Sequence, residues 1–293
     1  MQKIDNAFKP GDPVLEVAAR GKQMSLTGLD AGEDPENEHW IPRDKQAKLD
    51  GIVSGREKGH YYLLIGEKGT GKSSMLIDAM YRVNGEGCSM LEAHADPEIF
   101  RIRLGRALDF EYHEDNIGSL FSIRGPRDGG PILDIERAFN KLEKVALRHR
   151  DQKGKPLVLI INNFHLLRDD EDGRDLIELI QQRAESWAAS NLLTVLLNSD
   201  DYWVYERMKN LSTRMVVLPI HDLPKSEAIL ALRKYRAKYH KEEPSKEVLE
   251  KVYDKIGGRL TYLNRVARMK DMIPACDHIC AAEKTWFLNK VCL

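Results

Sequence analysis

One segment combines glycines, a lysine and a serine at a spacing that can bind phosphate. The run from Gly66 to Ser73 has the sequence G-E-K-G-T-G-K-S, which matches the pattern G-x-x-x-x-G-K-S. Glycines let backbone N–H groups close around an anion at the start of a helix. In such a loop the lysine, here Lys72, reaches the β- and γ-phosphates, and the Ser73 hydroxyl coordinates Mg²⁺. The motif predicts a site for a nucleoside triphosphate with Mg²⁺, and the expected contacts are Gly66, Glu67, Lys68, Gly69, Thr70, Gly71, Lys72, Ser73 and Ser74.

The residues on either side of this loop favour the same interpretation. The apolar segment 61–65 precedes the loop and is predicted to be a strand, and the segment 74–80 follows it and is predicted to be a helix. A strand, a glycine-rich loop and a helix form the context that this motif needs. A glycine turn without function is the alternative, and the flanking strand and helix argue against it.

Apolar segments alternate with helical ones along most of the chain. Helices are predicted at 40–52, 96–109, 176–189 and 199–211, with an amphipathic helix over 132–146. Short apolar strands are predicted at 61–65, 88–92, 157–161, 192–197 and 215–220. Continuously apolar strands that alternate with helices indicate a parallel sheet covered by helices on both faces. The predicted fold class is therefore α/β, with a five-stranded parallel sheet of the P-loop type.

Two regions of the chain lack predicted strands. Residues 1–39 are rich in Gly, Asp, Glu and Pro and have no periodicity, which predicts a flexible N-terminal arm. After residue 223 the chain shows only helical segments, near 225–240, 246–256 and 260–273. We therefore expect a nucleotide-binding core over residues 40–222 and a small all-helical lid over residues 223–293.

Two amides occupy positions where acidic residues are expected, at the end of the strand 157–161. In proteins with this loop the strand ends with an acidic residue near Mg²⁺, and a glutamate often follows and activates the attacking water. Here the two positions are Asn162 and Asn163. An amide can accept a hydrogen bond from a metal-bound water, but it carries no negative charge and cannot act as a base near pH 7. Losing a positioned base typically costs about 10²–10⁴-fold in rate, so we expect nucleotide binding with slow or absent hydrolysis.

Other polar residues near these strands could compensate for the missing acids. Asp169, Asp170 and Asp200 follow predicted strands, but acidic loop residues are usually just exposed, so we favour a solvated loop. For His165, which is close in sequence, a packing role or a role at a helix start is favoured over catalysis.

Two residues at strand ends are candidates for contacts with the γ-phosphate. Asn198 follows the strand 192–197 and could contact the γ-phosphate or its water, with a simple turn residue as the alternative. Arg214 lies just before the strand 215–220, where an arginine of one subunit could stabilise the phosphoryl group transferred in another. A surface arginine is the alternative there, and Arg207 is a weaker candidate for the same role.

The composition argues against several classes of partner. The chain is 42% hydrophobic and 31% charged, and its net charge of −1 gives no general attraction to nucleic acid or to anionic membranes. Its longest aliphatic runs are far shorter than the ~20 residues that span a bilayer, and its first forty residues fit neither a secretory signal nor a transit peptide. The basic segment 232–241 could contact nucleic-acid phosphates, but a solvated helix face is favoured. We expect an intracellular protein in the cytoplasm, the nucleus or the mitochondrial matrix.

The cysteines predict neither a disulfide scaffold nor a metal site. Four cysteines are too few for such a scaffold in a chain of 293 residues, so we expect reduced thiols. The segment 276–280 has the spacing of half a metal site, but no second half follows it, so ordinary helix packing is favoured.

Two further segments accompany the phosphate-binding loop. Residues 40–45 have the sequence W-I-P-R-D-K, and residues 256–263 have the sequence I-G-G-R-L-T-Y-L. Together with the loop they resemble the AAA+/STAND class, in particular its origin-recognition-like and archaeal-ATPase-like branches. The resemblance implies that Arg43 lies beside the adenine of ATP and that Arg259 is a sensor arginine over the phosphates. It also implies that ATP and Mg²⁺ bind between the core and the lid.

Four further runs of residues, all from residue 161 onward, indicate a closer resemblance. The runs I-N-N-F, E-S-W-A-A-S-N, N-S-D and G-G-R-L-T are similar to the ATPase domain of the fungal mitochondrial escape protein family and of its soluble relatives, over about residues 40–275. That family has Asp where Asn162 stands, which again predicts weak hydrolysis. In the soluble relatives a winged-helix domain follows the lid, so we expect this sequence to be a shortened form. Without a membrane segment, residence in the inner membrane is not implied.

Three functions remain open from the sequence. The first is an ATP-dependent switch in which Arg259 reports the γ-phosphate. The second is an ATPase active as a homo-oligomer, with Arg214 acting across the subunit boundary. The third is a small-molecule kinase, against which the segment 257–259 and Arg43 argue.

Overall fold

The computed structural model describes residues 2–11, 13–16, 41, 43–112 and 130–291. The described chain forms two compact units. The sheet unit contains the first residues of the chain together with Lys45–Gly66 and Ser73–Pro219. The helical unit contains Ile41, residues 43–44, the loop Glu67–Lys72 and the chain from Ile220 onward. The phosphate-binding loop therefore contributes residues to both units, and each unit is described by itself.

The sheet unit is built on a five-stranded parallel sheet in the order β2-β3-β4-β1-β5. Its strands are β1 (Tyr61–Ile65), β2 (Cys88–Glu92), β3 (Leu157–Asn162), β4 (Leu193–Ser199) and β5 (Met215–Pro219). Every residue of β1, β3 and β4 is buried, as expected for central parallel strands with both faces covered. The predicted α/β fold class is confirmed.

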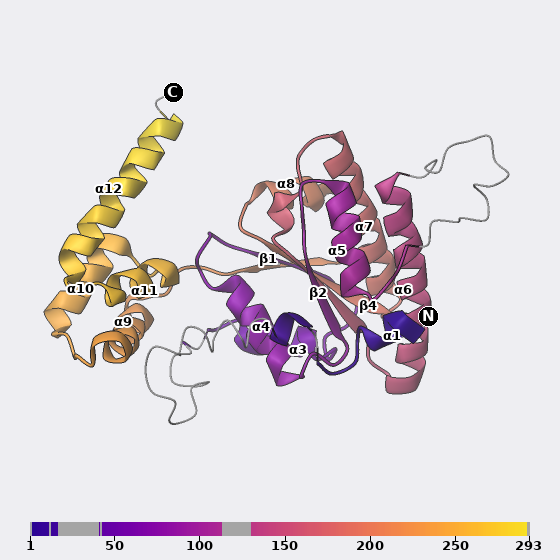
Figure 1. The fold of residues 1–293 in the computed structure, drawn as a ribbon, viewed down its shortest axis with the longest axis horizontal. Helices are drawn as coiled ribbons and strands as arrows, with labels where there is room; N and C mark the ends of the chain where they lie inside the picture. The colour runs from indigo at the N-terminus through magenta and orange to yellow at the C-terminus, as the bar shows by residue number, and fades with distance from the viewer. Residues whose placement is uncertain (1, 12, 17–40, 42, 113–129, 292–293) are drawn as a thin grey trace. The chain divides into compact units, whose positions relative to one another are not determined.

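Helices cover both faces of this sheet (Figure 1). On one face lie α3 (Gln46–Val53) and α4 (Lys72–Arg82), which are joined by a hydrogen bond from Gln46 Nε2 to the Met75 carbonyl at 3.2 Å. The other face carries α5 (Pro97–Ala107), α6 (Pro131–Lys153) and α7 (Glu171–Ala189). The largest fully buried side chain is Trp187, whose ring meets Phe139 edge to face at 5.3 Å.

The first residues of the chain are part of this core. The prediction of a flexible arm is wrong for the described residues of this region, because Gln2–Asn6 form α1, and Ile4 and Phe8 are buried in the core that includes α6. A hydrogen bond from Tyr81 Oη to the Leu15 carbonyl, at 2.8 Å, also holds this segment. Ile4 and Phe8 are four positions apart, which is a helical spacing, but two apolar residues are too short a pattern to predict a helix on their own.

Several predicted boundaries shift in the structure. The helix expected from residue 40 begins at Gln46, and residues 41 and 43 are not helical. The acidic loop 169–173 is largely the start of α7, with Asp170 as its N-cap accepting a hydrogen bond from the Gly173 N–H at 2.9 Å. The helix expected over 199–211 is split into α8 (Trp203–Met208) and the 3₁₀ turn η2 (Lys209–Leu211).

Four helices form the main part of the helical unit: α9 (Lys225–His240), α10 (Lys246–Ile256), α11 (Leu260–Arg268) and α12 (Met272–Val291). They share a buried core that includes Leu232, Leu249, Leu263 and Cys276. The sequence predicted one helix over 260–273, whereas α11 ends at Arg268 and α12 begins at Met272. Pro274 is compatible with the first turn of α12, where its missing N–H is not needed.

Candidate phosphate-binding site

The phosphate-binding loop links β1 to α4, as its sequence predicts. Its glycines Gly69 and Gly71 have φ angles of +88° and +97°, a region that side chains other than glycine rarely adopt. The Lys72 side chain is almost fully buried, and its Nζ donates a hydrogen bond to the Glu67 carbonyl at 2.9 Å. The Thr70 hydroxyl donates to the same carbonyl at 3.0 Å. The ammonium group that this motif directs to phosphate is thus held inside the loop.

Within the helical unit, the start of α11 packs on this loop. The Thr261 N–H donates to the Gly69 carbonyl at 3.3 Å. A Cβ atom added at Gly69 would lie 2.2 Å from Thr261 Oγ1, and one added at Gly71 would lie 3.0 Å from Leu260 Cδ1. Glycine is therefore required at Gly69 by its backbone angle and by the close approach of α11.

Arg259, the residue before α11, joins the loop to a carboxylate. Its Nε and Nη2 donate to the two oxygens of Asp222 at 2.6 and 3.0 Å, and its Nη1 donates to the Lys68 carbonyl at 3.1 Å. The Glu67 carboxylate lies 3.9 Å from the same Nη1. The hydrogen bonds with Asp222 raise the pKa of Arg259 further, and burial only partly opposes this. Arg259 thus contacts the loop, and its role over the phosphates stays a prediction; no signal in the sequence pointed to its partner Asp222.

Arg43 also lies in the helical unit. Its Nη2 donates to the His221 carbonyl, while its Nη1 is buried without a hydrogen-bond partner among the described residues. Burial lowers the pKa of Arg43, against the opposing effect of nearby acidic groups such as Asp44 and Asp222. A buried donor without a partner is costly, and a ligand with an acceptor atom would satisfy it.

In the sheet unit, Ser73, Asn162 and Asn198 form one hydrogen-bonded cluster. Asn198 Nδ2 donates to Asn162 Oδ1 at 2.6 Å and to Ser73 Oγ at 3.2 Å, and Ser73 Oγ donates to Asn162 Oδ1 at 3.2 Å. The Asn162 and Asn198 side chains are buried, and Asn198 Oδ1 has no hydrogen-bond partner among the described residues. The carboxyl ends of β3 and β4 and the start of α4 bring these three residues together.

The oxygen atoms of this cluster are compatible with binding of Mg²⁺. Hydroxyl and amide oxygens are hard donors that Mg²⁺ accepts, and the unpaired Asn198 Oδ1 adds another oxygen. No carboxylate of the described residues hydrogen-bonds to any of the three side chains. The cluster thus fits Mg²⁺ as a neutral site, in which the negative charge must come from the phosphates.

The residues that could replace the missing acids have other contacts. Asp169 is exposed and pairs with Arg174 at 2.9 Å, and Asp170 caps α7. The Asp200 N–H donates to His165 Nδ1 at 3.0 Å, which ties the end of β4 to the turn after β3. Asn163 has φ +55° and ψ +39°, a left-handed conformation that asparagine tolerates better than most residues.

Arg214 is exposed, and its backbone is held by hydrogen bonds to Glu185 that the sequence did not reveal. The Glu185 carboxylate accepts hydrogen bonds from the N–H groups of Thr213 and Arg214 at 2.7 and 3.2 Å. Burial would raise the pKa of Glu185, but these hydrogen bonds outweigh it and lower the pKa. The Arg214 guanidinium itself contacts only the Gly59 carbonyl, at 3.4 Å, among the described residues. Arg207 is exposed on α8.

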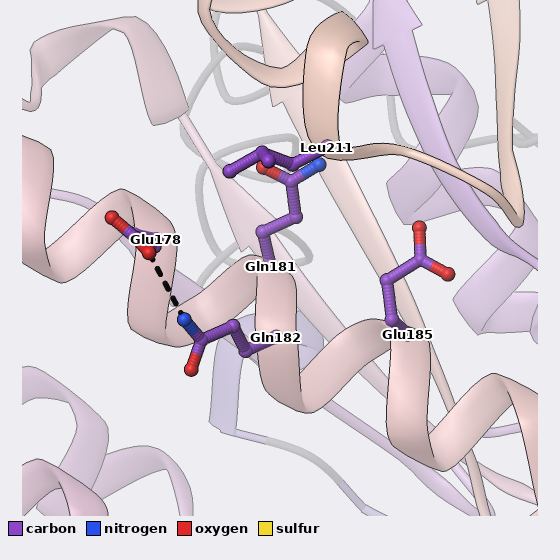
Figure 2. A pocket seen from close by; sticks show the side chains of 5 residues that line it. All are labelled: Glu178, Gln181, Gln182, Glu185 and Leu211. Atoms are coloured by element: carbon purple, nitrogen blue, oxygen red, sulfur yellow. Dashed lines mark hydrogen bonds between the residues drawn. The ribbon is translucent and has the colours of Figure 1, made fainter.

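A cavity of about 250 Å³ is lined in part by Glu185, and none of its lining residues belongs to the predicted site (Figure 2). Its walls are Glu178, Gln181, Gln182 and Glu185 of α7 and Leu211 of η2. The polar walls bond to other protein groups, since Gln182 donates to Glu178 at 3.0 Å and Gln181 donates to the Met208 carbonyl at 2.8 Å. This cavity is not a candidate for the predicted chemistry.

Two other candidate sites gain no support. Among the described residues, no group of three or more His, Cys, Asp or Glu side chains could hold a metal ion, the segment 276–280 included. On the basic helix α9, Arg236 is buried and donates to the Lys270 carbonyl at 2.8 Å beyond the end of α11, which is a structural role.

None of the described helices is both long enough and apolar enough to cross a membrane.

Comparison with known proteins gives the following. A family model described as "AAA ATPase domain" matches residues 40–195, more than half of the chain. A solved Walker-type ATPase of Pyrococcus abyssi is similar with a TM-score of 0.60 at 14% identity, over 89% of this chain and 77% of that chain. Cdc6p of Pyrobaculum aerophilum (TM-score 0.49, 13% identity, 80% and 62% covered) and domain III of the Thermotoga maritima replication initiation protein DnaA (0.42, 12%, 80% and 88%) are more distant. No curated protein matches the sequence.

Proposed function

This chain belongs to the AAA ATPase domain family, and on that premise we propose that it binds ATP with Mg²⁺ as a nucleotide-dependent switch and hydrolyses ATP slowly or not at all. The observation that carries this proposal is the neutral cluster of Ser73, Asn162 and Asn198 at the end of the phosphate-binding loop. The helices from residue 223 onward would act as the lid of such a protein.

The proposed ATP binding rests on two cationic side chains, Lys72 and Arg259. Each now donates a hydrogen bond to a backbone carbonyl of the loop, and in the bound state phosphate oxygens would replace these carbonyls. Lys72 donates to the Glu67 carbonyl and Arg259 to the Lys68 carbonyl, so each cation can exchange a neutral backbone acceptor for an anionic one. Hydrogen bonds in which both partners are charged are shorter and stronger than those to a neutral carbonyl. In the proposed bound state the buried Arg43 Nη1 would donate to an acceptor of the nucleobase.

The cluster would hold Mg²⁺ through the Ser73 hydroxyl and the Asn162 amide oxygen. When bound, Mg²⁺ neutralises charge on the phosphates and orients them. Asn198 keeps Asn162 Oδ1 in place through the 2.6 Å hydrogen bond and supplies no charge of its own. Because none of these groups is anionic, Mg²⁺ should aid ATP binding less than it does in a site with a carboxylate.

Slow hydrolysis follows from the same residues. Asn163 cannot remove a proton from water near pH 7, and Asp169 and Asp170 are engaged at the start of α7. Asp200 directly follows β4, where its backbone N–H donates a hydrogen bond to His165. Binding without fast turnover is the behaviour expected of a switch, since the bound state then persists.

A switch requires contacts that differ between two states, and Arg259 offers such contacts. With ATP, Arg259 would contact the γ-phosphate, whereas with ADP it would stay on the Lys68 carbonyl. The start of α11 follows Arg259 directly and packs on the loop through Thr261, so it would respond to that exchange.

The test combines ATP binding and steady-state hydrolysis on the same purified protein, with and without Mg²⁺. We expect tight, Mg²⁺-aided binding with little turnover, and loss of binding in Lys72→Ala. Asn162→Asp should increase the effect of Mg²⁺ on ATP affinity by about tenfold or more, because it adds a charge beside the Ser73 hydroxyl. Asn210→Asp, which adds the same charge at an exposed position, serves as the control.

Two results would contradict the proposal. Robust turnover in the unaltered protein would mean that Asn162 and Asn163 are compensated, so that the protein is an active ATPase. If Mg²⁺ raised the ATP affinity of Asn162→Asp and of Asn210→Asp by the same factor, the cluster would not be the metal site.

An ATPase that is active as an oligomer is the second candidate, and Arg214 favours it. Its backbone is fixed by Glu185 while its side chain is exposed, as an arginine that acts on another subunit would be.

A further inference from the structure

The two sides of the Arg259 guanidinium have different partners. The side formed by Nε and Nη2 is held by both oxygens of Asp222, whereas Nη1 is directed to the Lys68 carbonyl of the phosphate-binding loop. We propose that Asp222 is a positioning residue, which fixes this orientation and thereby sets the preference of the protein for a nucleoside triphosphate over a diphosphate. This inference rests on the proposed role of Arg259 in binding the terminal phosphate.

The position of Asp222 is itself fixed on both sides. The carbonyl of its neighbour His221 accepts a hydrogen bond from Arg43, and the N–H of its neighbour Leu223 donates to the Gly258 carbonyl at 3.0 Å. A Cβ atom added at Gly258 would lie 1.9 Å from the Leu223 carbonyl oxygen, so the backbone beside Arg259 packs directly on this segment. Asp222 and Arg259 are therefore held at both the backbone and the side chain.

A paired hydrogen bond of this kind fixes the plane of the guanidinium. An arginine side chain loses rotamer freedom when it is ordered, and Asp222 already imposes this order before nucleotide binds. The Arg259 side chain is only 19% exposed and needs no reorientation for Nη1 to exchange the Lys68 carbonyl for a phosphate oxygen. Preorganised donors of this type strengthen binding because the ordering cost is met in the free protein.

The opposite interpretation is that Asp222 competes with the phosphate for Arg259. In that case removal of its charge would strengthen ATP binding. The geometry favours positioning, because Asp222 occupies Nε and Nη2 and leaves Nη1 on the loop. The two interpretations predict changes of opposite sign, so one measurement separates them.

The effect should be confined to the terminal phosphate. Lys72 donates to the Glu67 carbonyl, whereas Arg259 donates to the Lys68 carbonyl, so the two cations have different acceptors in the loop and we expect the contribution of Lys72 to ADP binding to be independent of Asp222. Substitution of Asp222 should therefore change ATP affinity and leave ADP affinity nearly constant. A merely structural defect would weaken both.

The experiment measures the dissociation constants of ATP and ADP, each with Mg²⁺, by titration calorimetry. We expect Asp222→Asn to weaken ATP binding about fivefold and ADP binding less than about twofold, since the amide keeps one acceptor oxygen but places an NH₂ group against the second N–H of Arg259, so that one of the two hydrogen bonds is lost. Arg259→Ala should weaken ATP binding more strongly, and Asp222→Asn should add nothing in the Arg259→Ala background. Asp254→Asn is the matched control, because Asp254 pairs with Lys225 at 3.3 Å in the same unit without contacting Arg259.

Three results would overturn the inference. They are tighter ATP binding in Asp222→Asn, an equal loss for ATP and ADP, and a further loss from Asp222→Asn when Arg259 is already alanine. The failure of the proposed function has a different signature. If the unaltered protein binds neither nucleotide, or if Arg259→Ala leaves the ratio of ATP to ADP affinity unchanged, the premise fails before Asp222 is tested.

Discussion

Replacement of Gly69 by alanine is the sharpest test of the contact between the phosphate-binding loop and α11. The new Cβ would lie 2.2 Å from Thr261 Oγ1, 2.9 Å from Thr261 Cγ2 and 3.1 Å from Thr261 Cβ. Rotation of the exposed threonine can move the first two atoms away, but its Cβ cannot move without the backbone of α11. Overpacking of this kind costs about 1–3 kcal/mol, and alanine at φ +88° adds roughly 1–2 kcal/mol of strain.

We therefore expect Gly69→Ala to lower the free energy of unfolding by about 2–4 kcal/mol, measured by urea denaturation. Thr261→Ala should recover about 1–2 kcal/mol of this in the double variant, because two of the three clashing atoms are removed, and should cost less than about 1 kcal/mol alone. Gly87→Ala isolates the strain, since Gly87 has φ +76° and no atom within 4 Å of an added Cβ.

Hydrogen exchange of the Thr261 amide reports the same contact locally. This N–H donates to the Gly69 carbonyl, so its exchange should become faster in Gly69→Ala while the exchange of the β-sheet amides stays slow. If alanine costs no more at Gly69 than at Gly87, or if Thr261→Ala recovers nothing, then the loop and α11 are not packed as described. Arg259, which directly precedes α11, would then not be placed on the loop as the proposed role of Asp222 requires.

Two further predictions concern oligomeric activity and pH. If the protein is an oligomeric ATPase, its turnover per chain should rise with protein concentration. Turnover should fall about 10³-fold or more in Arg214→Ala but not in the control Arg207→Ala. Turnover that is independent of protein concentration would contradict a role of Arg214 between subunits. Burial lowers the pKa of His149 from its ordinary value of 6.5, partly offset by its hydrogen bond to the Lys155 carbonyl. The unfolded chain then binds more protons just below pH 6.5, so the free energy of unfolding should fall as the pH drops through this value, and this slope should be smaller in His149→Gln.

The sheet and the loop could be predicted from the sequence because their signals are local. Four of the strands are mainly apolar runs and β2 follows a glycine-rich turn, and the predicted bounds of all five lie within two residues of the observed ends. The phosphate-binding loop is a contiguous motif between a strand and a helix. Asn162 and Asn198 were singled out because they end strands, and the order β3-β4-β1 makes those ends neighbours of the loop. Proximity of this kind follows from parallel topology alone.

The partners of these residues could not be predicted, because they depend on contacts between distant positions. Asp222 pairs with Arg259 across 37 positions, and Glu185 holds Thr213 across 28 positions. Each is a single carboxylate without a motif, and sequence pattern does not distinguish it from exposed acids such as Asp169. The structure separates them, since Asp169 pairs with Arg174 five positions away whereas Glu185 fixes the segment that leads into β5.

The backbone of Asn163 bears on how far one substitution could restore hydrolysis. At φ +55° and ψ +39° asparagine is accommodated well, whereas glutamate at the same position would carry strain of roughly 1 kcal/mol or more. A missing carboxylate at Asn162 concerns only the charge around Mg²⁺, and a new aspartate there would accept the existing hydrogen bonds from Ser73 and Asn198. Asn162→Asp should therefore change the Mg²⁺ dependence of ATP binding far more than it changes the hydrolysis rate. On the proposed function, a missing base at Asn163 involves both the side chain and the turn that carries it, so ATP binding and turnover should respond to different substitutions.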